Sequence, residues 1–262
     1  MDYFVKQDSV VRQIWGKGDT ILFIFAGAAA EFALNKAVDW LYFTGRLPAD
    51  PLGRLFTTVD YARQIIFSEE QAAHRAIDQI TAIHTGVESA RGARIPAWAY
   101  RDVLFLLIDY SIRSFELVER PLTIVEKEEV YAVFYRLGRR MAIPDLTLSY
   151  TDWLPLRQAH LQQHLEFSPF SQDLYRQYRL HLGAFRYRIL LEAQRLVIPL
   201  TVGQMLGFRR RSLLGPVLLL YKGFRRLGLE WLLKGIFLPP AYRQQIRALD
   251  QVPPDRGRPR GH

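Results

Sequence analysis

The chain has 262 residues, 49% of them hydrophobic, and a formal net charge of +9. A chain of this length can bury one sizeable core, so we expect a single domain over residues 1–262. It contains no cysteine, which excludes disulfide bridges, thiolate haem ligation and cysteine-type zinc sites. It also lacks hairpin dipeptides such as Asn-Gly and any sustained alternation of apolar and polar residues. We therefore predict an all-α fold, an orthogonal helical bundle.

The first long helix is expected over residues 20–40, with Asp19 as its N-cap. Small residues fill positions 26–30 of this helix. They allow close approach either of another helix or of a flat macrocycle. Asp39 falls at the end of the predicted helix, where a surface carboxylate or a helix-end charge is expected.

A helical hairpin is predicted next, over residues 51–67 and 69–85. Proline suits the first turn of the first helix, where its missing N–H would be unpaired anyway. Ser68 and Gln71 fit a capping box at the start of the second helix, and Gly86 fits a stop at its end.

Three polar residues lie far from the turn of this hairpin. Arg54 and Thr58 are four residues apart and share a face of the first helix. Arg54 lies 14 residues before Ser68 and His84 lies 16 after it, so each is roughly 21–24 Å from the turn. We expect Arg54, Thr58 and His84 to face one pocket. His84 projects from an apolar stripe, so it is either a ligand or a core histidine bonded to a carbonyl or to Thr58.

Residues 100–119 are predicted to form a long, largely buried helix. Asp109 in its apolar stretch needs a partner. Arg113 and Glu116 share its face, so the three side chains are expected to form a network. Alternatively, one of the two carboxylates orients a metal-bound histidine.

Two histidines, His160 and His164, lie four residues apart on a helix expected over residues 152–166. Such a pair can share a metal ion. The glutamate that metalloproteases carry directly after the first histidine is missing, because Leu161 stands there. The other interpretation is a solvated helix face with Gln162 and Gln163.

Positive charge concentrates in the last third of the chain. From Ser171 onward there are 17 Lys and Arg against 5 Asp and Glu, whereas residues 1–170 hold 18 against 21. Arginines alternate with aromatics on a helix expected over residues 172–198, and residues 201–250 are predicted to be a basic amphipathic helical extension. Residues 171–250 therefore suggest an anionic membrane surface as partner, or an ordinary basic subdomain. Nucleic acid is not expected because no recognition motif is present. Residues 251–262 are predicted to be a disordered basic tail.

Several positions in the first 144 residues resemble, in order and spacing, the superfamily of MpaB and the latex-clearing proteins, or rubber oxygenases. The matching positions are Gly18, Asp19, Asp50, Pro51, Gly53, Arg54, Thr58, His84, Asp109, Glu116, Pro121, Leu122, Leu137, Gly138, Ile143 and Pro144. The resemblance covers roughly residues 18–200, the expected catalytic core.

This resemblance implies an internal pocket for haem b. It implies that His84 is the proximal ligand of the haem iron and that Arg54 and Thr58 line the distal side. Thr57 stands where some relatives carry a distal lysine, and Asp39 falls near the acid proposed as base. The implied reaction is O₂-dependent cleavage of a carbon–carbon double bond in an apolar substrate such as an isoprenoid.

The sequence therefore predicts a haem-dependent oxygenase-like protein. The alternative is a non-catalytic, membrane-associated helical protein, with or without bound haem. The N-terminal residues lack a signal-peptide pattern, and the longest charge-free runs are 13 and 11 residues, too short to span a bilayer. We expect a cytoplasmic protein, peripheral at a membrane if residues 171–250 bind one.

Overall fold

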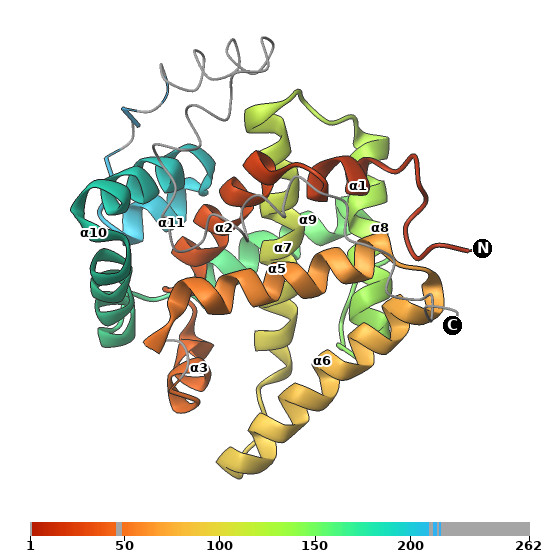
Figure 1. Cartoon of the computed structure of the whole chain (residues 1–262), viewed down its shortest axis with the longest axis horizontal. Coiled ribbons are helices and arrows are strands. Elements are labelled where there is room, and N and C mark those ends of the chain that lie inside the picture. The colour runs from red at the N-terminus through yellow and green to blue at the C-terminus, as the bar shows by residue number, and fades with distance from the viewer. Residues whose placement is uncertain (1, 46–48, 210–211, 214, 216–262) are drawn as a thin grey trace, which may run out of the picture.

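The computed structural model describes residues 2–45, 49–209, 212, 213 and 215 (Figure 1). These residues form helices and no strand, which confirms the all-α prediction. The helices in chain order are α1 (Val10–Trp15), α2 (Gly18–Phe32), η1 (Lys36–Val38), α3 (Asp39–Phe43), α5 (Pro51–Phe67), α6 (Glu70–Arg91), α7 (Ala97–Val118), α8 (Ile124–Arg140), α9 (Tyr150–Gln163), α10 (Pro169–Val197) and α11 (Leu200–Met205).

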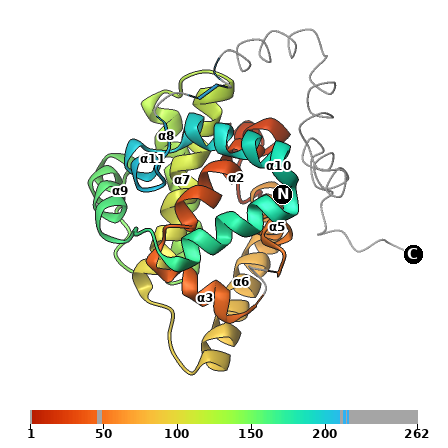
Figure 2. The same cartoon turned by 90° about the vertical axis from the view of Figure 1, so that its left-hand side faces the viewer.

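The fold is built around the contact between α2 and α7. Gly27 makes this contact close: a Cβ atom placed on it would lie 2.3 Å from Cδ1 of Tyr110. The close approach expected of residues 26–30 is therefore made by another helix. α10 lies across α2 and α5 and covers them on one side (Figure 2).

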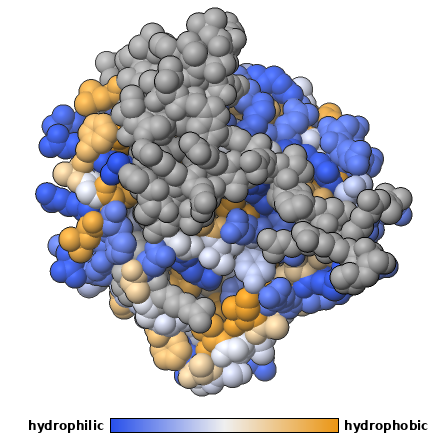
Figure 3. Space-filling view, in the orientation of Figure 1, coloured by the Kyte–Doolittle hydropathy of each residue, from blue (hydrophilic) through white to orange (hydrophobic). Residues whose placement is uncertain are grey.

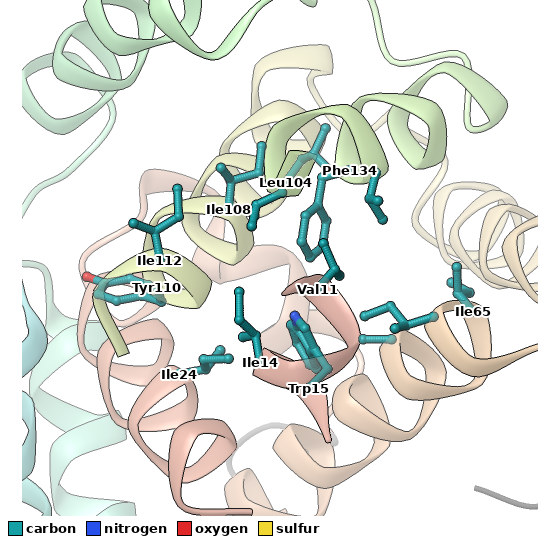
Figure 4. Packing of buried hydrophobic residues seen from close by; sticks show 14 of the residues in the cluster. Val11, Ile14, Trp15, Ile24, Ile65, Leu104, Ile108, Tyr110, Ile112 and Phe134 are labelled. Atoms are coloured by element: carbon teal, nitrogen blue, oxygen red, sulfur yellow. The ribbon is translucent and has the colours of Figure 1, made fainter. Parts of the chain in front are cut away.

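The main core lies where α1, α2, α5, α7 and α8 meet. Val11, Ile14 and Trp15 of the short helix α1 point inward toward α7 and α8 (Figure 4). The indole Nε1 of Trp15 donates to Ser111 Oγ at 3.1 Å. This bond satisfies the one polar atom that the ring brings into the core.

The predicted helix over residues 20–40 is wrong in its length and its cap. α2 begins at Gly18, so Asp19 lies in its first turn, and the helix ends at Phe32. Leu34 then accepts a hydrogen bond from the backbone of Glu166 at 2.8 Å, and the Asn35 side chain caps η1. The helix stops because residues 34–36 pair with the link between α9 and α10, which lies far away in sequence.

The hairpin prediction is right for α5 and wrong for both ends of α6. Ser68 and Gln71 form no capping box: the N-cap is Glu69, without a side-chain bond. The N-terminal segment supplies partners instead, because Phe4 N donates to Ser68 O at 3.2 Å and Glu70 N donates to Asp2 O at 2.9 Å.

The end of α6 lies beyond the expected stop. Gly86 does not stop the helix, which runs on to Arg91. It ends at Gly92, whose φ of 68° is the left-handed conformation in which glycine is favoured.

The later helices agree more closely with their predicted limits. Thr123 and Glu126 form a capping box at the start of α8. The cap of α10 is Ser168, and Ser171 completes the capping box from the third helical position. Gly183, with φ 71° and ψ 165°, kinks α10.

Most of the predicted extension over residues 201–250, and all of the tail over residues 251–262, lie outside the described residues. Among the described helices, none combines the length and the apolar character that crossing a bilayer would require.

Candidate functional site

His84 lies on α6, and its ring is partly buried. The ring meets Tyr100 of α7 edge to face, with 5.2 Å between centroids. Its Nδ1 atom is buried and has no hydrogen-bond partner among the described residues. A core histidine would be expected to satisfy this atom, since a buried, unpaired polar group costs about 1–3 kcal/mol.

Burial lowers the pKa of His84, and the positive charge of Arg54 lowers it further, while Glu88 opposes them. The imidazole is therefore neutral near pH 7. This is the state in which a histidine nitrogen can bind a metal.

Arg54 is the fourth residue of α5. Asp50 is the N-cap of this helix, and its side chain accepts a hydrogen bond from Gly53 N at 2.8 Å. α5 and α6 diverge from the turn that joins them (Figure 1). Even so, Arg54 is near enough to act on the pKa of His84. The guanidinium of Arg54 therefore lies within electrostatic range of the imidazole that the hairpin spacing predicted to share its pocket.

The two threonines of α5 differ in exposure. Thr58 is partly buried, and its hydroxyl donates to Arg54 O at 3.2 Å. Thr57 is exposed, and its hydroxyl donates to Gly53 O at 2.9 Å. Thr58 therefore lies on the more enclosed side of α5, whereas Thr57 faces solvent.

Glu88 and Tyr100 belong to the surroundings of His84 and were not predicted. Glu88 lies one turn after His84, and its Oε1 accepts from Tyr100 Oη at 3.1 Å and from Ile95 N at 2.9 Å. These bonds fasten the end of α6 to the start of α7. The i, i+4 spacing of His84 and Glu88 could have indicated the acid, but Tyr100 becomes a neighbour only through the loop at residues 92–96.

Asp39 lies at the start of α3 and pairs with Arg91, with 2.7 Å between Oδ2 and Nη2. The Arg91 guanidinium also lies over the Trp40 ring, 4.0 Å from its centroid. Arg91 is seven residues after His84, two helical turns along the same side of α6. Asp39 is therefore held at the far end of the helix that carries His84.

Asp109 is paired, as its apolar surroundings require. It accepts from Arg113 at 2.7 Å and from Arg157 of α9 at 2.8 Å. Glu116 was expected in this network but binds Lys127 at 2.9 Å and the backbone of Leu122 at 3.0 Å. The carboxylate that acts on His84 is Glu88, so neither Asp109 nor Glu116 takes the expected orienting role there.

A second polar cluster is buried between α2, α7 and α9. Arg157 donates to Glu31 of α2 at 2.5 and 2.6 Å, and Tyr110 donates to the same carboxylate at 2.8 Å. Burial would raise the pKa of Glu31, but attraction to Arg157 and hydrogen bonds from Arg157 and His160 outweigh it and lower the pKa to about 2.

The solvated face expected for His160 and His164 is wrong, because His160 is buried and His164 is partly buried. His160 Nε2 lies 2.9 Å from Glu31 Oε1, and His164 Nδ1 lies 2.9 Å from Asp102 Oδ2. The sequence could not place these imidazoles, because their partners come from helices about 60 and 130 residues away. Among the described residues, Asp102, His160 and His164 form a group that could hold a metal ion. His84 could supply a single ligand through its unpartnered nitrogen.

The family comparison matches most of the chain. Residues 13–249 match the family described as "ER-bound oxygenase mpaB/B'/Rubber oxygenase, catalytic domain". Neither the curated proteins nor the solved structures provide a match.

Proposed function

The chain belongs to the mpaB/B′ and rubber oxygenase catalytic-domain family, and from this membership we propose that it is a haem b-dependent oxygenase-like protein. Its substrate would be apolar, such as an isoprenoid, and the reaction an O₂-dependent cleavage of a carbon–carbon double bond or a related oxidation. The proposed ligand of the iron is His84.

The observation that carries this proposal is the buried, unpartnered Nδ1 of His84. An imidazole that is neutral and has a nitrogen without a protein partner fits an axial ligand better than a packing residue. Haem, when bound there, would supply the iron that activates O₂.

Arg54 would provide a fixed positive charge with N–H donors on the same side as the imidazole. Its guanidinium suits a carboxylate such as a haem propionate, or negative charge that develops on oxygen during the reaction. Thr58 would add a hydroxyl beside it.

Asp39 is the proposed base, and its salt bridge with Arg91 bears on that role. The Arg91 guanidinium holds the carboxylate in place, but it also competes for the oxygen that would accept a proton. Asp39 would therefore act only when the substrate or the cofactor displaces Arg91.

Apolar side chains are exposed near these residues, as an apolar substrate would require. Phe43 of α3, Ile83 beside His84 and Val103, one turn after Tyr100, are all exposed. Hydrophobic surface also gathers at the lower edge of the molecule, over α3 and the far half of α6 (Figure 3). We propose this edge as the approach for the substrate.

The first experiment is a visible absorption spectrum of the purified chain after haem supplementation. We expect a Soret band that is lost in His84→Ala and retained in His74→Ala. His74 is a matched control, because it is a partly buried histidine ten residues earlier on the same helix, with its ring against Phe4. A colourless but folded protein would contradict the haem proposal and favour the non-catalytic alternative. Product analysis with an isoprenoid and O₂ then tests turnover.

Association with an anionic membrane is a separate part of the proposal. On α10, Leu180 and Phe185 are 68% and 59% exposed, and Arg179 and Arg188 beside them are exposed as well. Exposed apolar side chains next to exposed arginines suit a membrane interface.

Flotation with anionic vesicles tests this face. We expect binding by the natural chain, loss of binding in the double variant Leu180→Ser and Phe185→Ser, and no loss in Leu148→Ser. Leu148 is a control at an even more exposed position before α9. No flotation of the natural chain would refute the membrane part alone.

A further inference from the structure

Three metal-binding side chains converge where the end of α9 meets α7. Asp102 comes from the first half of α7, His160 from the last turn of α9, and His164 from the C-cap of that helix. One ligand atom of each lies within 4.8 Å of the others. Asp102 Oδ1 is 2.8 Å from His160 Nδ1, and its Oδ2 is 2.9 Å from His164 Nδ1.

Asp102 is fully buried, yet no arginine or lysine within the described ranges forms a salt bridge with it. Its partners are the two imidazoles and, at 3.4 Å, the side-chain amide of Asn35. The nearby carboxylates differ, because Glu31 and Asp109 both bind Arg157. A buried carboxylate is expected to be paired with a cation or to bind a metal ion.

His160 is buried, with 3% of its surface exposed, and its two ring nitrogens have different surroundings. Nε2 meets Glu31 Oε1 at 2.9 Å. Nδ1 points toward Asp102 but makes no hydrogen bond of acceptable geometry within the described structure. Metal-bound histidines usually donate their second ring N–H to a carboxylate, which is the relation between His160 and Glu31.

We propose that Asp102, His160 and His164 bind a divalent first-row transition metal ion, such as Zn²⁺, through one carboxylate oxygen and the two Nδ1 atoms. This site is separate from His84 and does not depend on haem. A fourth coordination position would lie on the side of His164, whose side chain is 22% exposed. The ion would fasten the end of α9 to α7.

The carboxylate requires only a small adjustment. Ligands about 2.0–2.1 Å from a tetrahedral Zn²⁺ ion are roughly 3.3 Å apart. With Asp102 Oδ1 as the ligand, its separations of 2.8 Å from His160 Nδ1 and 3.1 Å from His164 Nδ1 must open by about 0.5 and 0.2 Å. His164 can supply this movement, because it lies after the last turn of α9. The Trp98 ring packs on His164, with 4.6 Å between centroids, and covers one side of the site.

Metal content of the full chain tests the proposal. The protein is stripped with a chelator, dialysed against Zn²⁺ and analysed by elemental mass spectrometry. The natural chain is expected to retain about one Zn²⁺ per chain. His164→Gln is expected to lose most of it, whereas His74→Gln, a histidine on α6, should bind like the natural chain. The same measurement on His84→Ala should still give one Zn²⁺, which separates this site from the haem proposal.

X-ray absorption at the zinc edge provides a second readout that does not depend on the folding of a variant. Two nitrogen ligands and one carboxylate oxygen at about 2.0–2.2 Å support the proposal. Less than a tenth of an equivalent of Zn²⁺ on the natural chain would overturn it. Equal binding by His164→Gln and His74→Gln, or a zinc shell without histidine, would overturn it as well.

Discussion

Arg157 of α9 donates two hydrogen bonds to Glu31 of α2, at 2.5 and 2.6 Å, and both side chains are buried. Two more bonds, at 3.0 and 2.8 Å, join the same arginine to Asp109 of α7. One guanidinium thus connects three helices that are distant in sequence. Because each charge lies away from water, the connection is stable only while every partner is present.

Arg157→Met is therefore expected to lower the free energy of unfolding by about 3–5 kcal/mol, since it leaves Glu31 buried and without its main cation. Arg113→Met is the control, because Arg113 also binds Asp109 but its side chain is 41% exposed. It should cost no more than about 1 kcal/mol. Denaturant unfolding of the two variants measures the difference, and similar losses would show that burial does not decide the strength of these pairs.

Acid should weaken this connection over a defined range. The pKa of Glu31 is about 2 in the folded chain, against 4.5 as its ordinary value. The unfolded chain therefore binds a proton more readily, and the stabilisation is complete above pH 4.5 and lost as the pH falls from 4.5 toward 2. The loss is expected to be on the order of 3 kcal/mol.

Unfolding at a series of pH values would measure this loss, and Glu31→Gln should reduce its slope with pH. Glu126→Gln serves as the control, because its bonds to Arg120 and Thr123 also lower the pKa of Glu126 to about 2, but at the surface. An unchanged slope in Glu31→Gln would mean that other carboxylates govern acid unfolding.

Local signals were sufficient for part of the fold. α5 has a proline in its first turn, an Asp50 cap and an apolar face, all readable from neighbouring residues, and its predicted limits are those of the structure. The predicted limits of α2 and α6 were wrong because residues far away in sequence supply the backbone hydrogen-bond partners of Leu34 and Ser68. The same reason limits what the sequence could predict about the candidate sites. The spacing of Arg54 and His84 could be predicted, because both lie on one helical hairpin. The contact of Tyr100 with His84, and the partners of His160 on α2 and α7, could not be predicted.

Two glycines in helices should respond in opposite ways to alanine. Gly27→Ala would place a methyl group 2.3 Å from the Tyr110 ring, which cannot move away without losing its hydrogen bond to Glu31. We expect a loss of about 1–3 kcal/mol. At Gly86, no atom lies within 4 Å of the added methyl group, so alanine should stabilise α6 by up to about 1 kcal/mol. Thermal unfolding of the two variants would show whether each substitution lowers or raises the stability of the chain. A Gly27→Ala variant as stable as the natural chain would contradict the close contact of α2 and α7.

The two adjacent threonines of α5 offer a test of which side of this helix faces the cofactor. Thr58→Val keeps the shape of the side chain but removes the hydroxyl next to Arg54, whereas Thr57→Val removes an exposed hydroxyl. Both variants should keep the Soret band of the haem-loaded protein, because the proposed ligand of the iron is His84. Thr58→Val is expected to slow turnover by up to about 10²-fold, the lower end of the range for the loss of one hydrogen-bond donor in an active site, and Thr57→Val should change it less. Steady-state rates with one isoprenoid substrate would compare them. A larger loss in Thr57→Val would place the distal side on the exposed face of α5, where the family resemblance puts its lysine.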